Sequence, residues 1–210
     1  MIKVAYCNVE DLDLAESYKL LPQHRREKAS RFRFDKDKKL SCGAYLLLKK
    51  LLDGEGITNP AFKLAKYGKA CISNHENIHF NLSHSNKLVA CAISDREVGV
   101  DVEYIDAGID LNIAKNYFFN TEYDGIIKSP NPSDEFFKYW VLKESYMKYT
   151  GLGFNRDLDS FEIIISDDIK LKNDKNNLKF SLFDLHDYKL AFAGHYKVDN
   201  IVEVNVKELY

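Results

Sequence analysis

Alternation of apolar and polar residues is clearest in the segment EVGVDVEY, residues 97–104. Successive side chains of a β-strand point to opposite faces, so the three valines are predicted to share one face, and Asp101 and Glu103 the other. The two acids need an explanation, because like charges that lie side by side without a partner are unfavourable.

The rest of the chain divides into predicted strands and helices. Strands are expected at residues 2–9, in IHFNLSHS and KLVACAIS, and in a C-terminal antiparallel meander of FEIIIS, LKFSLFDL, YKLAFAGHY and IVEVNV. Helices are expected at about residues 20–28, in SCGAYLLLKKLLDGEG, in DLNIAKNYF and in EFFKYWVLKESYMKYTGLG. Glycines end the second and fourth of these helices, and Ser133 or Asp134 is expected to cap the fourth.

The dipeptide DR, residues 95–96, is short enough to join KLVACAIS and EVGVDVEY in a β-hairpin, although it lacks the glycine of the strongest hairpin turns. This hairpin would place Asp101 opposite Ala90 and Glu103 opposite Leu88. It would also open space beside Asp101.

Both halves of the chain are predicted to contain helices followed by strands, which is the pattern of an α+β fold. We place the boundary after Glu103, so that residues 1–103 form an N-terminal half and residues 104–210 a C-terminal half. The two halves show no obvious sequence repeat.

Composition narrows the class of protein. The 210 residues are 45% hydrophobic and 13% aromatic, which is ample material for a folded core. A formal net charge of -2 argues against a whole surface devoted to a polyanion, although it is compatible with a local basic patch. The four cysteines lack C-x-x-C spacing and are interpreted as free thiols in a reducing compartment. Without a leader or an apolar run of roughly 20 residues, the chain is expected to be cytoplasmic.

The adjacent carboxylates of Asp101 and Glu103 have two interpretations. They lie on an exposed strand face, or they hold a divalent cation that removes their repulsion. Mg²⁺ suits such a site because it binds through one or two carboxylates, keeps several waters and often completes its shell with substrate phosphates. Mn²⁺ is an alternative, since both ions favour oxygen ligands.

The helix EFFKYWVLKESYMKYTGLG carries a third acid. Phe137, Val141, Glu144 and Lys148 share one stripe at helical spacing, which places Glu144 among apolar neighbours. A half-buried acid needs a partner, and Lys148 at i+4 offers a simple ion pair as the structural alternative to a functional role.

Further features suggest phosphate binding. FNLSHS ends a predicted strand with Ser83 and His84, whose hydroxyl and imidazole can donate hydrogen bonds to a phosphate. Lys69 follows a glycine in KYGKA. Residues 25–39 hold eight Lys or Arg against three acids, which indicates a solvated helix face, a phosphate-binding patch or an RNA contact.

The motifs YGKA, FNLSHS, GVDVE and WVLKESYMKYTGLG have the order and spacing found in the Sfp-type 4′-phosphopantetheinyl transferases, and the chain resembles that family over most of its length. The resemblance implies transfer of the phosphopantetheine arm of coenzyme A to a serine of an apo carrier protein, with release of adenosine 3′,5′-bisphosphate. It also implies a pseudo-twofold monomer of two similar α/β halves with the active site between them. Carrier docking is expected near NYFFNTEYDG and the Glu144 helix.

The resemblance also implies individual roles. Asp101, Glu103 and Glu144 are expected to hold Mg²⁺, and Glu144 or a water that it orients is the candidate base. Lys148 is expected to contact a phosphate and to take part in catalysis. The other expected coenzyme A contacts are Arg25, Lys28, Lys39, Lys69, Ser83, His84 and Lys143. The chain departs from the family pattern at Ala70, where YGKP has proline, and at Lys39, where arginine is common.

Three alternatives to the transferase differ in their predictions. A degenerate homologue would bind coenzyme A without transferring its arm. An RNA-binding module built on the basic segment would show salt-sensitive affinity that does not need Mg²⁺. A magnesium phosphohydrolase would consume coenzyme A without an acceptor. For the transferase we expect neither a nucleic-acid nor a membrane partner.

Overall fold

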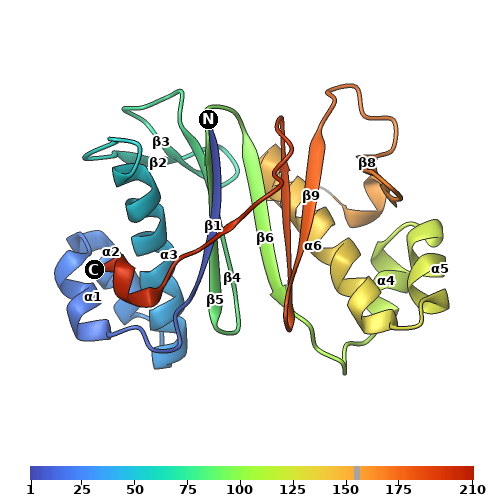
Figure 1. The fold of residues 1–210 in the computed structure, drawn as a ribbon, viewed down its shortest axis with the longest axis horizontal. Helices are drawn as coiled ribbons and strands as arrows, with labels where there is room; N and C mark the ends of the chain where they lie inside the picture. Colours follow the sequence, from blue (N-terminus) through green and yellow to red (C-terminus); the bar gives the residue numbers. More distant parts are fainter. Residues whose placement is uncertain (154–156) are drawn as a thin grey trace.

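The computed structural model describes residues 1–153 and 157–210 (Figure 1). Its helices are α1 (Leu14–Leu20), α2 (Gln23–Ser30), α3 (Asp35–Asp53), α4 (Asn112–Tyr117), α5 (Asn120–Lys128) and α6 (Pro132–Thr150). Its strands are β1 (Ile2–Asn8), β2 (Phe62–Leu64), β3 (Ala70–Ile72), β4 (His79–Ser85), β5 (Leu88–Ser94), β6 (Val98–Tyr104), β7 (Ile163–Ile165), β8 (Ile169–Leu171), β9 (Lys179–Leu185), β10 (Tyr188–Gly194) and β11 (Val202–Glu203). Short 3₁₀ helices span η2 (Leu158–Ser160) and η3 (Val206–Leu209).

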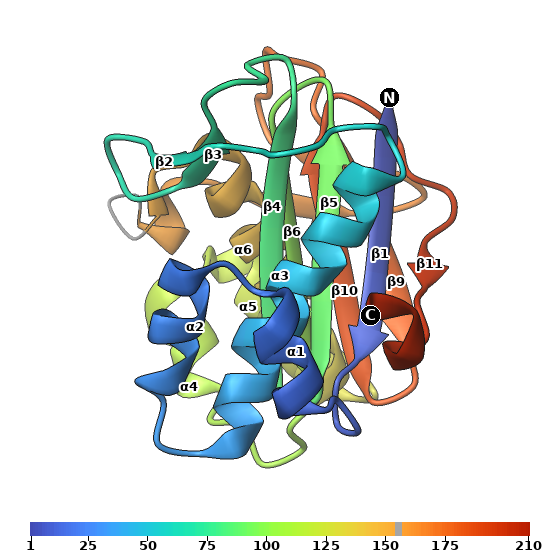
Figure 2. The same ribbon diagram turned by 90° about the vertical axis from the view of Figure 1, so that its left-hand side faces the viewer.

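Two sheets pack against each other at the centre of the molecule (Figure 1). The first has the strand order β11-β1-β5-β4 and the second the order β6-β10-β9. The 19-residue helix α3 covers the outer face of the first sheet, and the 19-residue helix α6 covers the outer face of the second. Helices α1 and α2 pack outside α3 (Figure 2). The predicted α+β class is therefore confirmed.

The core between the two sheets explains the valines of EVGVDVEY. Val98, Val100 and Val102 are at most 1% exposed and pack there with Leu190 and other apolar residues. Burying an apolar side chain stabilises the fold by about 1.5–3 kcal/mol relative to leaving it in water, so this alternation determines which face of β6 lies inside.

The helix predicted at about residues 20–28 corresponds to α2, and the separate helix α1 before it was not predicted. Asp13 caps α1, its carboxylate accepting hydrogen bonds from the backbone N–H groups of Ala15 and Glu16. The chain is extended at Leu21 and Pro22, and α2 begins after the proline. Proline fixes its own φ and disfavours helical backbone in the preceding residue, so one continuous helix is excluded here.

The predicted hairpin at residues 95–96 is wrong. All seven residues of β5 are buried, and its two edges are filled by β1 and β4. No backbone edge of β5 is left for β6, which crosses to the other sheet and pairs with β10. In that register Asp101 lies opposite Ala191, and Glu103 lies opposite Lys189.

The C-terminal half also departs from a simple meander. LKFSLFDL and YKLAFAGHY form the antiparallel pair β9 and β10, whereas β7 and β8 form a separate two-stranded sheet. The IVEVNV segment runs back to the first sheet, where β11 pairs with β1 in parallel. Helix α5 was not predicted, and α6 starts earlier than expected, with Asn131 as its cap and Pro132 in its first turn.

The boundary expected after Glu103 falls near the end of β6, which is a strand of the second sheet. That boundary assigns the GVDVE strand to the N-terminal half, but β6 hydrogen-bonds within the sheet of the C-terminal half. Within the residues that the structure describes, no helix has the length and apolar character needed to cross a bilayer.

Candidate functional site

Gly99 lets helix α6 lie directly on strand β6. A Cβ at this position would lie 1.9 Å from the carbonyl oxygen of Ser145 and 2.4 Å from the backbone nitrogen of Tyr149. Only glycine permits this approach of helix backbone to strand backbone. The approach brings Glu144 and Lys148, on neighbouring turns of α6, next to the acidic face of β6.

Asp101 is the most deeply buried acid of this site, with 2% of its surface exposed. Its Oδ1 accepts hydrogen bonds from the Ser83 hydroxyl at 2.7 Å and from Lys148 Nζ at 2.6 Å. Lys148 Nζ also donates to Ser83 Oγ at 2.9 Å. Lys148 thus pairs with Asp101 on the facing strand, and the alternative of an i, i+4 pair with Glu144 is not what the structure shows.

Glu103 lies two residues further along the same face. The Ser85 hydroxyl donates to its Oε2 at 2.6 Å. Burial raises the pKa of Glu103 to about 7, the nearby Asp101 carboxylate adds to this effect, and the Ser85 hydrogen bond and the Lys148 charge oppose it.

Glu144 completes the set of acids predicted from the sequence. Burial raises the pKa of this carboxyl, the Asp101 charge raises it further and the Lys148 charge lowers it. Its Oε1 and the Oδ2 of Asp101 are both buried and have no hydrogen-bond partner among the described residues. Two such oxygens at one site are uncommon, because a buried polar atom without a partner is costly.

These unpartnered oxygens fit a hard cation. Mg²⁺ prefers oxygen ligands and commonly uses one or two carboxylates, with water and substrate phosphate in the other positions. The part of the chain that the structure describes holds no group of three His, Cys, Asp or Glu side chains already arranged around a metal position. A cation at these oxygens would take its remaining ligands from water and substrate.

A row of polar side chains on β4 forms the seam between the two sheets. Asn81 Oδ1 accepts a hydrogen bond from the Val100 backbone N–H at 2.9 Å, Ser83 donates to Asp101, and Ser85 donates to Glu103. These contacts recur at every second residue, which is the period of one strand face. Sequence reasoning missed Asn81 and Ser85, although the alternation of polar residues in FNLSHS carried the signal.

Ser83 and His84 take different positions. Ser83 is 6% exposed and is hydrogen-bonded to Asp101 and Lys148, and the coenzyme A contact expected for it stays a prediction. His84, the next residue of the strand, is exposed at the surface. Partial desolvation by surrounding protein atoms lowers the pKa of the His84 imidazole, and the nearby Lys148 charge lowers it further.

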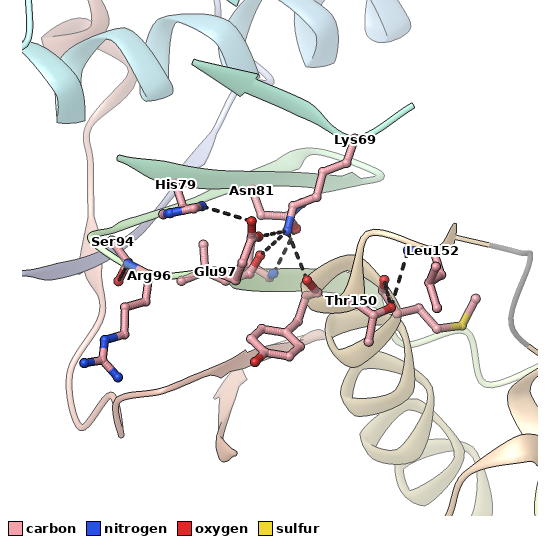
Figure 3. A network of polar contacts seen from close by, with 12 residues as sticks. Lys69, His79, Asn81, Ser94, Arg96, Glu97, Thr150 and Leu152 are labelled. Carbon is pink, nitrogen blue, oxygen red and sulfur yellow. Dashed lines mark hydrogen bonds and ion pairs between the residues drawn. The ribbon is translucent and has the colours of Figure 1, made fainter. Parts of the chain in front are cut away.

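Lys69, in the loop between β2 and β3, contacts the start of β6 and the end of α6 (Figure 3). Its Nζ pairs with Glu97 Oε2 at 2.6 Å and donates to the carbonyl oxygens of Val98 at 3.1 Å and Tyr149 at 3.2 Å. His79 Nδ1 lies 3.0 Å from the other oxygen of Glu97. In this structure the ammonium of Lys69 therefore links the start of β6 to the end of α6.

The three basic residues expected near the 3′-phosphate differ in exposure. Arg25 Nη2 donates to the Ser41 carbonyl at 3.1 Å, its guanidinium lies 5.2 Å from the Tyr45 ring centre, and burial lowers its pKa. Lys39 donates to the Glu10 carbonyl. Lys28 is exposed.

Lys143 does not face the acids. It is fully buried, pairs with Glu122 at 2.8 Å, and donates to the carbonyl oxygens of Phe161 at 2.8 Å and Leu158 at 2.9 Å. Burial lowers the pKa of Lys143 and raises that of Glu122, while their mutual attraction opposes both changes. In this structure Lys143 thus forms an internal ion pair that joins α5, α6 and the segment before β7, and its expected coenzyme A contact stays a prediction. Sequence reasoning missed Glu122.

Comparisons with known proteins bear on this site. The family model described as the 4′-phosphopantetheinyl transferase superfamily matches residues 97–193. A 4′-phosphopantetheinyl transferase of Bacillus subtilis is 33% identical over 183 residues, which cover 81% of this chain and 80% of that protein. The 4′-phosphopantetheinyl transferase Sfp of Bacillus subtilis strain 168 is 32% identical over 149 residues, covering 69% of this chain and 66% of Sfp.

A solved structure is more distant. Holo-[acyl-carrier-protein] synthase of Thermotoga maritima covers 46% of this chain and 61% of its own, with a TM-score of 0.40 and 19% identity. A likeness of this size adds nothing to the site assignment.

Proposed function

Since this chain belongs to the 4′-phosphopantetheinyl transferase superfamily and is a 4′-phosphopantetheinyl transferase, we propose that Asp101, Glu103 and Glu144 are the acids at which its Mg²⁺ binds. The family acts on apo carrier proteins with coenzyme A as substrate. The observation that supports the metal assignment is the pair of buried, unpartnered oxygens on Asp101 and Glu144. When bound, Mg²⁺ would neutralise charge on the pyrophosphate of coenzyme A.

The proposed reaction is a transfer of the phosphopantetheine group. The serine oxygen of the carrier bonds to the phosphorus that bears pantetheine, and the bond from that phosphorus to the bridging pyrophosphate oxygen breaks. Adenosine 3′,5′-bisphosphate leaves, and the serine proton must be accepted nearby. Glu144 is our candidate acceptor, because a half-buried carboxylate with a raised pKa binds a proton more readily than an exposed one.

Lys148 is proposed to stabilise the negative charge of the transferring phosphate. It is the cation that lies among the three acids, and its Nζ bonds to Asp101 and Ser83 before substrate arrives. Positioned cations that meet charge as it develops are among the largest contributions to phosphoryl transfer.

We propose that coenzyme A contacts His84 and Lys28, because both residues are exposed. Arg25, Lys39 and Lys69 would have to exchange a carbonyl or carboxylate partner for a phosphate oxygen. Lys143 and Ser83 are left out of this set because of their burial and their partners.

We also propose that the protein works as a cytoplasmic monomer whose two halves are related by a pseudo-twofold axis, with Mn²⁺ able to replace Mg²⁺. All four cysteines are free, which is the expected state in a reducing compartment. The carrier is proposed to dock near α4, α5 and α6, and neither nucleic acid nor a membrane is proposed as a partner.

Intact-protein mass spectrometry tests the proposed function. Several apo carrier proteins would be incubated with this protein, coenzyme A and Mg²⁺, with EDTA and an Asp101→Asn variant as controls. We expect a metal-dependent gain of one phosphopantetheine on at least one carrier, and none with the variant. Equal modification in EDTA, or by the variant, would contradict the metal assignment.

A further inference from the structure

The seam between β4 and β6 supplies hydroxyl groups to two of the proposed metal ligands. Ser83 and Ser85 each donate to one carboxylate oxygen, on Asp101 and Glu103 respectively. We propose that these two serines are positioning residues: each holds one oxygen of its acid and thereby orients the other oxygen toward the metal ion. The inference rests on the proposed function, because it concerns the same metal site.

The direction of each serine hydrogen bond is determined by its neighbours. A serine hydroxyl has one proton to donate and two lone pairs that accept. Ser85 Oγ accepts the backbone N–H of Tyr104 at 3.1 Å, which leaves its proton for Glu103. Ser83 Oγ accepts from Lys148 Nζ at 2.9 Å, which leaves its proton for Asp101. Both hydroxyls are therefore oriented before any metal binds.

The two serine–carboxylate hydrogen bonds connect strands of different sheets. Strand β4 belongs to the first sheet, whereas the acids belong to β6 of the second. Because the strands carry no backbone pairing with each other in these sheets, side chains determine how β4 sits against β6. Groups that orient metal ligands in this way typically change metal affinity 10- to 100-fold when they are removed.

Asn81 offers a matched control on the same strand and the same face. Its Oδ1 joins the seam by accepting the backbone N–H of Val100, and no hydrogen bond among the described residues links it to any of the three acids. An Asn81→Ala variant therefore loosens the seam without removing a donor from a carboxylate. A purely structural role of the serines would make all three alanine variants behave alike.

The experiment measures Mn²⁺ binding by the decrease of the free-ion electron paramagnetic resonance signal, in the presence of coenzyme A. The proteins compared are wild type, Ser83→Ala, Ser85→Ala, Ser85→Thr and Asn81→Ala, each checked for folding by thermal denaturation. We expect each serine-to-alanine change to weaken Mn²⁺ binding about 10-fold or more. Ser85→Thr, which keeps the hydroxyl, should restore most of the affinity, and Asn81→Ala should leave it within about twofold.

Two negative results are distinguishable. If the wild type binds Mn²⁺ and modifies a carrier while Ser83→Ala and Ser85→Ala bind Mn²⁺ equally well, the positioning role is overturned and the proposed function stands. If the wild type neither binds Mn²⁺ nor modifies any carrier, the proposed metal site fails, and this inference fails with it.

Discussion

Replacing Glu103 by Gln should stabilise the metal-free protein at alkaline pH. Burial, followed by repulsion from Asp101, raises the pKa of Glu103 to about 7 from an ordinary value of 4.5. Its cross-strand neighbour Lys189 offers little relief, because its ammonium pairs with Asp134 and Asp184. Between these two pKa values the folded protein holds a proton that the unfolded chain has released. The free energy of unfolding therefore falls as the pH rises through this window.

The size of the effect follows from the two pKa values. One pKa unit corresponds to about 1.4 kcal/mol, so the separation between 4.5 and about 7 corresponds to at most about 3 kcal/mol above pH 7. Part of the Glu103 surface is exposed, so we expect about 1–3 kcal/mol. For a chain of this size that is a difference in Tm of roughly 2–10 °C.

The assay is thermal denaturation of wild type and Glu103→Gln in EDTA at pH 5 and pH 8. The variant should melt above the wild type at pH 8 and close to it at pH 5. Glu76→Gln, the same change at an exposed glutamate, is the control and should leave the Tm unchanged at both pH values. A variant that is less stable than the wild type at pH 8, or equally shifted at both pH values, would refute the reasoning.

Three further predictions concern α6 and its contacts. Gly99→Ala should lower the free energy of unfolding in urea by about 1–3 kcal/mol and abolish transfer, because the added methyl group would overlap the α6 backbone. A fully active and equally stable variant would contradict this. Glu144→Gln should bind coenzyme A normally in calorimetry yet lose turnover, and unchanged turnover would remove Glu144 from the role of base. Lys143→Met should lower the free energy of unfolding in urea by about 3–5 kcal/mol, because it leaves the Glu122 carboxylate buried without a cation. The double variant with Glu122→Gln should lose less stability. A single variant that is as stable as the wild type would argue against the ion pair.

Local patterns were sufficient for the elements with strong periodicity. Strands β1, β4, β5 and β6 lie where the apolar spacing placed them, and the long helices α3 and α6 contain most of their predicted segments but begin earlier than expected. The elements with weaker periodicity were not predicted, because other local signals interrupt their apolar spacing. Helix α1 is ended by an extended segment at Leu21 and Pro22, and α5 is short and polar at its start. Strand partners were also missed, since alternation shows which face of a strand is buried but not which strand lies beside it.

The chemistry of the acids is determined by the sequence itself. The period of two in GVDVE places Asp101 and Glu103 on one face of any strand, and the helical spacing in WVLKESYMKY places Glu144 and Lys148 on one stripe. Only the tertiary structure decides which groups meet them. Gly99 permits α6 to approach, Lys148 pairs with Asp101, and Ser83 and Ser85 orient the acids from the other sheet. The tertiary structure also places Lys143, one residue from Glu144, in the core beside Glu122. Such contacts join residues far apart in the chain, and their geometry depends on how two sheets and a helix pack together, which no local pattern encodes.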